Sequence, residues 1–395
     1  MGGNQSVPLP DDGSFLLYVG TGFPDDETPS KAILRVTLSP ETGALTLWPE
    51  LPVPMENPGW LSPVLGGDKI YVGYETDPGA LQAFNVGDGT GGIAPLGPAV
   101  SSVGRHPCYV AIDRTGEWCF AANYTEGSVC VCPITRGGNP QGLPGGSLGP
   151  ATDSKAHQGG DLIAAALHDR QEKAHCHCIV PHPSNAWVAV CDLGLSTVFV
   201  YAFDAERGAL IGAADDPRHL RMPPGAGCRH AVWDAAGTRL FVHNELDCTV
   251  TAAAFDAATG ALTETQTVGA LPEGVTGVRD HHRGGSDIHL HPNGRLLFVG
   301  ERSPDPGLIA AFTVGPAGNP APLRLAGHTP TRGLVPRNFK LVGEEGRWLV
   351  VGNQETKTVV SFAVDAETGA LTFASELSTA PYKPCNIAGP DAIFA

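Results

Sequence analysis

The sequence lacks any long apolar run, because none of its hydrophobic stretches approaches the ~20 residues that a membrane-spanning helix needs. Its first residues show no basic region followed by an apolar core, so no secretory signal pattern is present. Charged residues make up only 17% of the chain, and the formal net charge is −16 without any basic stretch. We therefore expect neither a membrane span nor a nucleic-acid partner.

The chain also lacks the cysteine spacing of the usual zinc sites. Ten cysteines are present, mostly inside or beside apolar strand-like runs, where a free thiol behaves as a small hydrophobic group. Without a secretion signal, reduced thiols and a cytoplasmic location are the simpler interpretation. We expect no metal and no cofactor. The opening residues match the short acylation pattern at Gly2 and Ser6, which leaves myristoylation of Gly2 open.

Helix signals are scarce, whereas 51 glycines and 35 prolines indicate many tight turns. One phrase recurs seven times, as the end of an apolar run, a turn and then a leucine. Examples are VTLSPETGAL from Val36, YAFDAERGAL from Tyr201, AAFDAATGAL from Ala253 and FAVDAETGAL from Phe362. The spacing averages about 54 residues, which is the period of a propeller blade.

Two further apolar runs, separated by Asp/Pro-x-x-Gly turns, precede the phrase in segments such as 109–134, 230–256 and 288–314. The sequence therefore predicts an all-β, seven-bladed β-propeller with about four antiparallel strands per blade. We expect one propeller domain over residues 1–395, with a flexible amino terminus over about residues 1–14. Whether the protein is a monomer or a dimer stays open.

One gap in the repeat is longer than the others. Residues 135–174 are rich in Gly, Pro and Ser, and we interpret them as a long loop inserted between blades, with a helix predicted over Asp161 to Ala174. The gap ends at His175 and His177, which alternate with Cys176 and Cys178. In an extended chain, both imidazoles would share one face and both thiols the other. Paired imidazoles suit acid/base chemistry at neutral pH.

Several motifs spread over residues 15–387 resemble those of one family, the seven-bladed lactonase propellers, which include bacterial 6-phosphogluconolactonases and fungal carboxymuconate-cyclising enzymes. The motifs are Asn123-Tyr124, Arg170-Gln171, His175-x-His177, Asp192-Leu193-Gly194, Gly227-Cys228-Arg229-His230, Asn244-Glu245-Leu246, Arg302, Pro336-Arg337-x-Phe339 and Asn353-Gln354. Four positions depart from the family, among them Cys176 and Cys178, which flank the histidines where the family more often has small or hydroxyl residues. Cys228 replaces a proline, and Glu301 stands where the family has asparagine, so its carboxylate can pair with Arg302 and weaken the hold on an anion.

The resemblance implies a site at equivalent strand ends around a central channel. We expect catalytic roles for His175, His177, Arg229 and Glu245. Substrate contacts are expected from Asn123, Tyr124, Arg170, Gln171, Arg302, Arg337 and Gln354. Clustered guanidinium groups favour a small anionic substrate that they hold with paired hydrogen bonds.

The expected reaction is hydrolysis of an acidic sugar lactone, above all 6-phospho-D-glucono-1,5-lactone. A histidine would act as general base on water and Arg229 would stabilise the oxyanion, with Glu245 orienting an imidazole or pairing with an arginine. Two alternatives stay open: a carboxymuconate-type lactonising cycloisomerase and a non-catalytic binding propeller. Which histidine is the base also stays open.

Overall fold

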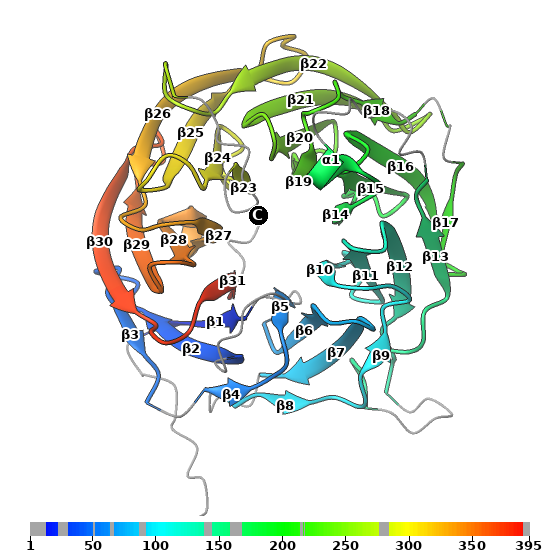
Figure 1. Cartoon of the computed structure of the whole chain (residues 1–395), viewed down its shortest axis with the longest axis horizontal. Coiled ribbons are helices and arrows are strands. Elements are labelled where there is room, and N and C mark those ends of the chain that lie inside the picture. Colours follow the sequence, from blue (N-terminus) through cyan, green and yellow to red (C-terminus); the bar gives the residue numbers. More distant parts are fainter. Residues whose placement is uncertain are drawn as a thin grey trace, which may run out of the picture.

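The computed structural model describes residues 13–22, 31–49, 52–63, 67–86, 92–137, 144–158, 168–213, 216, 218–275 and 284–389. In this part of the chain, seven antiparallel sheets stand in a ring, as Figure 1 shows. The fold predicted from the repeat, a seven-bladed β-propeller with about four strands per blade, is confirmed. The amino-terminal residues 1–12, including Gly2, lie outside the described residues.

Blade 1 joins the two ends of the chain, because the last strand pairs with the first. It contains β31 (Pro384–Ala388), β1 (Phe15–Thr21), β2 (Ala32–Leu38), β3 (Leu45–Leu47) and β4 (Val53–Pro54). Blade 2 contains β5 (Pro58–Pro63), β6 (Lys69–Tyr74), β7 (Ala80–Asn85), β8 (Ala94–Pro95) and β9 (Val100–Ser101). Blade 3 contains β10 (Pro107–Ile112), β11 (Trp118–Asn123), β12 (Ser128–Pro133) and β13 (Asp153–Ala156).

The remaining blades follow in chain order. Blade 4 contains β14 (Cys176–Pro181), β15 (Trp187–Asp192), β16 (Thr197–Asp204), β17 (Ala209–Ile211) and β18 (Leu220–Arg221). Blade 5 contains β19 (Cys228–Trp233), β20 (Arg239–Asn244), β21 (Thr249–Asp256) and β22 (Ala261–Gly269). Blade 6 contains β23 (Gly285–Leu290), β24 (Leu296–Glu301), β25 (Leu308–Val314) and β26 (Leu323–Pro330). Blade 7 contains β27 (Pro336–Val342), β28 (Trp348–Asn353), β29 (Thr358–Val364) and β30 (Leu371–Ser378).

Helical structure is short in the described segments. It consists of α1 (His168–Gln171) and a 3-10 turn at Glu344–Gly346. No helix among the described residues is long and apolar enough to cross a membrane.

The turn of the recurring phrase packs against a tryptophan of the neighbouring blade, for example at two glycines. The glycine of its turn has a positive φ at Gly208 and Gly260, and an added Cβ would lie 2.1 Å from the Trp118 ring and 2.3 Å from the Trp187 ring. Each indole also donates its Nε1 hydrogen to a carbonyl of the same turn, at 3.1 Å for Trp118 and 3.2 Å for Trp187. Only glycine allows both the backbone conformation and this close ring contact.

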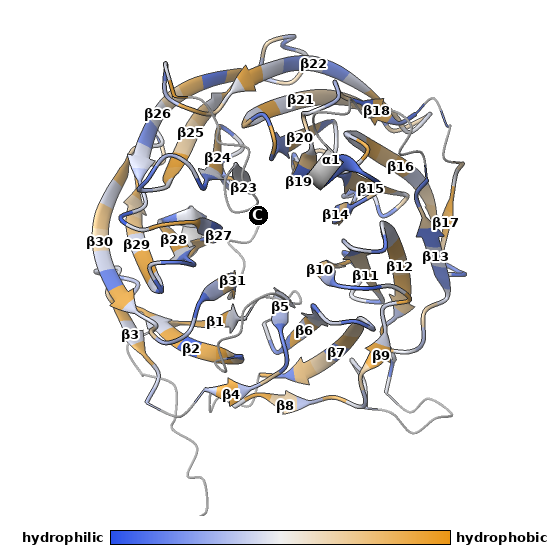
Figure 2. Cartoon of the chain, viewed as in Figure 1, coloured by the Kyte–Doolittle hydropathy of each residue, from blue (hydrophilic) through white to orange (hydrophobic). Residues whose placement is uncertain are grey.

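The core lies between the faces of adjacent blades. One buried cluster, for example, joins Ala189 and Val200 of blade 4 to Trp233 and Leu240 of blade 5. The outer strands are less buried, and in Figure 2 the middle of β22 is hydrophilic, with hydrophobic residues only near its ends. An outer strand has one solvated face, whereas the middle strands are buried on both faces.

Every inner strand carries a bulge near its first residue, because two of its residues oppose one residue of the neighbouring strand. The extra residues are Gly59, Cys108, His177, Arg229, Arg337 and Cys385, and in β23 either Ser286 or Asp287. A bulge redirects a side chain and often lies next to a functional site. We call the ring formed by these bulge residues, together with the residue that precedes each of them, the start rim.

The bulge of β14 corrects the predicted His/Cys alternation. The strand begins only at Cys176, so His175 lies outside it, and His177 is the extra residue. Cys176 packs in the cluster that contains Phe120 of blade 3, whereas Cys178 packs in the cluster that contains Trp233 of blade 5. The two thiols therefore occupy opposite faces, since one extra residue reverses the alternation of a strand.

The segment 135–174 is also more structured than predicted. It contains β13, the outer strand of blade 3, whose polar sequence DSKA gave no apolar alternation to detect. The predicted helix of Asp161 to Ala174 is described only from residue 168 and ends at Gln171.

Candidate functional site

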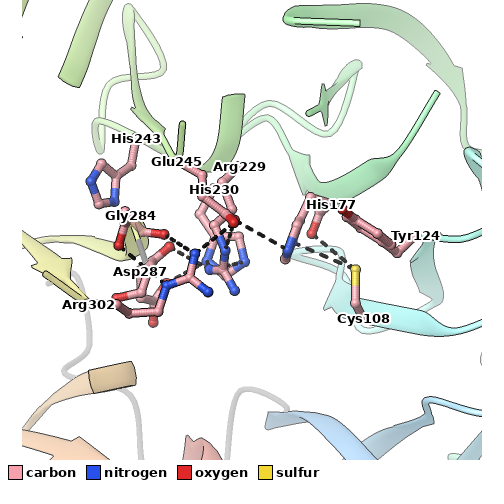
Figure 3. Close-up of polar contacts among 12 residues, drawn as sticks. Cys108, Tyr124, His177, Arg229, His230, His243, Glu245, Gly284, Asp287 and Arg302 are labelled. Atoms are coloured by element: carbon pink, nitrogen blue, oxygen red, sulfur yellow. Dashed lines mark hydrogen bonds and ion pairs between the residues drawn. The ribbon is translucent and has the colours of Figure 1, made fainter. Parts of the chain in front are cut away.

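Glu245 forms the centre of the candidate site. It follows β20, its side chain is 1% exposed, and three guanidinium groups surround it, of which Figure 3 labels those of Arg229 and Arg302. Arg170 and Arg302 lie 2.5 Å and 2.7 Å from its Oε1, and Arg229 Nε lies 2.8 Å from its Oε2. Burial alone would raise the pKa of Glu245, but the three arginines hold it well below its usual value. The carboxylate is therefore ionised at neutral pH.

Arg229 is the bulge residue of β19 and is almost completely buried. Burial lowers its pKa to about 10, with further lowering by Arg302 and Arg337 and partial compensation by Glu245. It stays protonated at neutral pH. One terminal nitrogen donates to the Ser286 carbonyl at 2.5 Å and lies 3.0 Å and 3.2 Å from the ring nitrogens of His230.

His177 faces this cluster from blade 4. Its Nε2 is 4.0 Å from Glu245 Oε2, and its Nδ1 is 3.7 Å from the Cys108 sulfur. Burial, followed by the charge of Arg229, lowers the pKa of His177 well below 6.5. The imidazole is therefore neutral at physiological pH, as a general base must be.

His175 has a different environment. Its ring stacks on Tyr124 with centroids 4.4 Å apart, Nε2 lies 2.9 Å from Glu172 Oε1 and Nδ1 lies 3.1 Å from the Tyr124 carbonyl. Both ring nitrogens thus have protein partners. The Tyr124 hydroxyl accepts a hydrogen bond from Arg170 Nε at 3.2 Å, so His175 supports the residue that supports Arg170.

The other residues expected to contact substrate differ in their surroundings. Arg337, the half-buried bulge residue of β27, lies close enough for its charge to lower the pKa values of His177 and Arg229. Gln171 instead bonds the Leu193 carbonyl, the Ser196 hydroxyl and the Gly225 amide, and the Asn123 amide bonds the Ser102 carbonyl and Ser128 hydroxyl. The Gln354 side chain is buried after β28, and its Oε1 lacks a hydrogen-bond partner among the described residues.

Sequence reasoning missed a second buried carboxylate, Asp287. Its Oδ1 accepts from His230 Nδ1 at 2.8 Å, and its Oδ2 accepts from His289 Nε2 at 3.0 Å and from Asn338 Nδ2 at 2.5 Å. Burial would raise the pKa of Asp287, yet the two histidines hold it well below its usual value. The sequence offered only an indirect signal for Asp287. Two of its partners, His230 and Asn338, each directly follow a candidate site residue, Arg229 and Arg337.

Glu301 does not pair with Arg302 in the way the sequence suggested. Its Oε1 accepts from His243 Nε2 at 2.8 Å, and both side chains are fully buried. Arg302 instead turns to Glu245 and to the carbonyls of Gly284 and Gly285, at 3.3 Å and 2.9 Å. The departure from the family at position 301 therefore leaves Arg302 in the site.

One group among the described residues has the composition of a metal site. His157, Cys176 and Asp192 bring three ligand atoms within 4.8 Å of one another. His157 Nδ1 is 2.7 Å from Asp192 Oδ2, its Nε2 is 2.9 Å from the Tyr201 hydroxyl, and the thiol lies 3.2 Å from Nδ1. Hydrogen bonds thus satisfy all three groups, and three ligands fall short of the four that a structural zinc site needs.

Comparison with known proteins places the chain in a family. The family model described as "Lactonase, 7-bladed beta-propeller" matches residues 16–386. The chain belongs to this family. Its members are lactonases, which are hydrolases, and this chain is an enzyme of that class.

Several relatives span nearly the same length as this chain. The 6-phosphogluconolactonase of Bacillus subtilis is 29% identical over 372 residues, which cover 94% of this chain and 97% of that protein. The periplasmic gluconolactonase of Pseudomonas aeruginosa superposes with a TM-score of 0.82 at 26% identity, covering 95% of this chain and 99% of the other. A Lactobacillus plantarum protein gives a TM-score of 0.79 at 27% identity, with 95% and 99% covered.

Proposed function

We propose that this lactonase opens an acidic sugar lactone at the start rim, with 6-phospho-D-glucono-1,5-lactone as the favoured substrate. The single observation that carries the proposal is the placement of a neutral imidazole and a guanidinium on the same carboxylate oxygen. His177 Nε2 and Arg229 Nε lie 4.0 Å and 2.8 Å from Glu245 Oε2. Arg229 Nε and Glu245 Oε2 are also buried without a well-directed hydrogen bond among the described residues.

In the proposed reaction, His177 removes a proton from water as the water oxygen bonds to the lactone carbonyl carbon. The carbonyl oxygen becomes an oxyanion, which the cationic Arg229 stabilises. The bond between that carbon and the ring oxygen then breaks. The proton held by His177 passes to the departing ring oxygen, which leaves an open-chain acid with one new hydroxyl group.

Glu245 has a positioning role in this scheme. Its negative charge offsets the guanidinium groups of Arg170, Arg302 and Arg229, which would otherwise repel one another in a buried site. It also holds Arg229 next to His177, because both side chains approach its Oε2. Arg337 and Lys173 supply positive charge for a phosphate at the rim, where the Lys173 ammonium already donates to the Thr125 carbonyl at 2.7 Å.

The name of the B. subtilis relative supports the phosphorylated substrate, whereas the name of the P. aeruginosa protein supports unphosphorylated gluconolactone as the second candidate. A cytoplasmic location is part of the proposal, because all ten cysteines are free thiols.

The test is hydrolysis of freshly generated 6-phosphogluconolactone, corrected for spontaneous opening, beside glucono-1,5-lactone and carboxymuconate. We expect the phosphorylated lactone to give the highest kcat/KM. Arg337→Gln should raise KM for this substrate about tenfold or more and leave KM for gluconolactone nearly unchanged. Equal kcat/KM values for the two lactones would show that the enzyme does not recognise the phosphate group. Folded protein without activity on either lactone would contradict the proposal itself.

A further inference from the structure

A cavity lies along the inner strands, on the side away from the start rim. It has a volume of about 500 Å³, within the range of small-molecule sites. Its walls include residues at or next to the last positions of four inner strands, together with exposed turn residues, which open it to solvent. These residues are Pro63 of β5, Ile112 of β10, Leu290 of β23, Leu341 of β27, and Arg114 and Thr115 of the following turn.

Three aromatic rings separate this cavity from the start rim. Trp60 and Tyr109 stack with centroids 4.1 Å apart and line the cavity. The His230 ring meets both rings edge-on, at 5.3 Å and 5.1 Å. Because a terminal nitrogen of Arg229 lies 3.0 Å and 3.2 Å from the ring nitrogens of the same imidazole, His230 links the aromatic wall of the cavity to Arg229.

Two basic residues and one acidic residue line this cavity, in a chain whose formal net charge is −16. Lys340 lines it and is only 8% exposed, and Arg114 lies at its edge. The carboxylate of Asp113 also lines it, but both oxygens are occupied by the amides of Glu117 and Trp118 and by Thr115 and Asn185. A locally positive cavity in an acidic protein selects an anion.

The cavity also touches the reaction centre through one carboxylate. His289, whose side chain is 31% exposed, lines the cavity and donates to Asp287 Oδ2 at 3.0 Å. The other oxygen of Asp287 accepts from His230 at 2.8 Å, and His230 lies under Arg229. A ligand that binds His289 is thus three contacts from the guanidinium group of the proposed reaction centre.

We propose that this cavity is a second ligand site, for a small sugar acid or a similar hydroxylated carboxylate, distinct from the site of hydrolysis. Lys340 and His289 hold the carboxylate, and the surface of Trp60 and Tyr109 packs against the carbon chain, as aromatic residues do in many small-molecule sites. The site stands whether or not the reaction at the start rim is the proposed one.

The test uses D-gluconate as the probe, with inorganic phosphate as a second arm, and isothermal titration calorimetry of the full chain. Lys340→Met should weaken gluconate binding about tenfold or more, because it removes a charge-assisted contact. Lys155→Met is the matched control: it removes the same charge on outer strand β13, where Lys155 pairs with Asp153 at 3.1 Å, and should bind as the wild type does. Arg337→Gln should retain the Lys340-dependent component.

A crystal of the wild type soaked in D-gluconate should place the carboxylate beside Lys340 and His289. Should Lys340→Met fail to fold, His289→Gln provides the same comparison. The proposal is overturned if gluconate gives no heat up to about 10 mM, or if it binds only at the start rim. Binding of phosphate without gluconate, or gluconate binding that neither variant weakens, would overturn it equally.

Discussion

The two halves of the start rim share one backbone geometry but carry different chemistry. In blades 4 to 7 the bulges present His177, Arg229, Ser286 or Asp287, and Arg337, which we call the charged half. In blades 1 to 3 they present Cys385, Gly59 and Cys108, which we call the small half. The fold therefore offers seven equivalent positions, and the sequence decides which of them hold reactive groups and which leave room.

The small half is not interchangeable with the charged half. An added Cβ at Gly59 would lie 2.6 Å from Glu75 Oε2, so even alanine is crowded there. Burial, aided by the charge of Glu75, raises the pKa of the Cys108 thiol well above its usual value, so this sulfur is not a thiolate nucleophile. In the proposed reaction, the small half shapes the site and the residues opposite it carry out the chemistry.

The largest effect is expected from His177. His177→Asn should lower kcat/KM for the lactone by roughly 10²–10⁴-fold, the contribution of a general base. His175→Asn is the matched control, because both ring nitrogens of His175 already bond Glu172 and the Tyr124 carbonyl; it should cost less than about tenfold. Steady-state kinetics on both variants measure the difference, and equal losses would show that the two imidazoles act as a pair.

The second-largest effect is expected from Arg229→Lys. Lysine retains the charge but cannot reach Glu245, the Ser286 carbonyl and an oxyanion together, so kcat should fall roughly 10²–10³-fold with a smaller change in KM. Arg239→Lys, on the far end of β20 where the guanidinium pairs with Asp234 at 2.9 Å, serves as the control. A change confined to KM would assign Arg229 to ground-state binding alone.

A moderate effect is expected from filling the small half. Cys108→Leu should raise KM by about tenfold because it narrows the rim, whereas Cys108→Ala should alter kcat/KM by less than about threefold. Thermal unfolding of both variants checks that the core is intact. A loss of more than about 10²-fold in Cys108→Ala would mean that the thiol takes part in the reaction.

The smallest effect concerns pH and stability. Burial, with the charge of Arg229 next, lowers the pKa of His230 to about 3 and that of His177 well below 6.5. Unfolded histidine binds a proton near pH 6.5 while these folded imidazoles stay neutral, so the free energy of unfolding should fall as pH drops below about 6.5. Each histidine contributes up to about 1.4 kcal/mol per pH unit.

Chemical denaturation at several pH values between 7.5 and 5 measures this slope. His177→Asn should reduce it, because one of the imidazoles with a lowered pKa is removed, while His230, His182, His219 and His291 keep theirs. Glu245, with its lowered pKa, adds a loss of stability only below its usual value of 4.5. An unchanged slope in His177→Asn would show that this histidine is already charged in the folded protein.

Much of the fold could be predicted from the sequence because the repeat is tied to packing. At Gly43, Gly208 and Gly260 the turn glycine lies against a tryptophan of the preceding blade, namely Trp348, Trp118 and Trp187, so the phrase recurs where such a contact joins two blades. The outer strand β13 was not predicted, because its residues are mostly polar and half exposed. The joining of β31 to β1 depends on a contact between residues far apart in the chain, which no local pattern reports.

The candidate site was predicted in part, for a similar reason. Motifs identified Arg229, Glu245 and Arg302, which the structure brings together at one carboxylate. Strict alternation along β14 treated His175 and His177 as equivalent, but one extra residue separates their environments. Asp287 escaped because a lone aspartate in a strand shows no motif, and its partners come from three different inner-strand positions.

The most direct test of the central claim is a crystal structure of the protein with 6-phosphogluconate, the product of the proposed reaction. We predict that the product carboxylate lies within about 3 Å of Arg229 and His177, with the carbon chain over Gly59 and Cys108 of the small half. A product whose carboxylate lies against the small half, or away from the start rim altogether, would contradict the division of this rim into a reactive half and a half that leaves room.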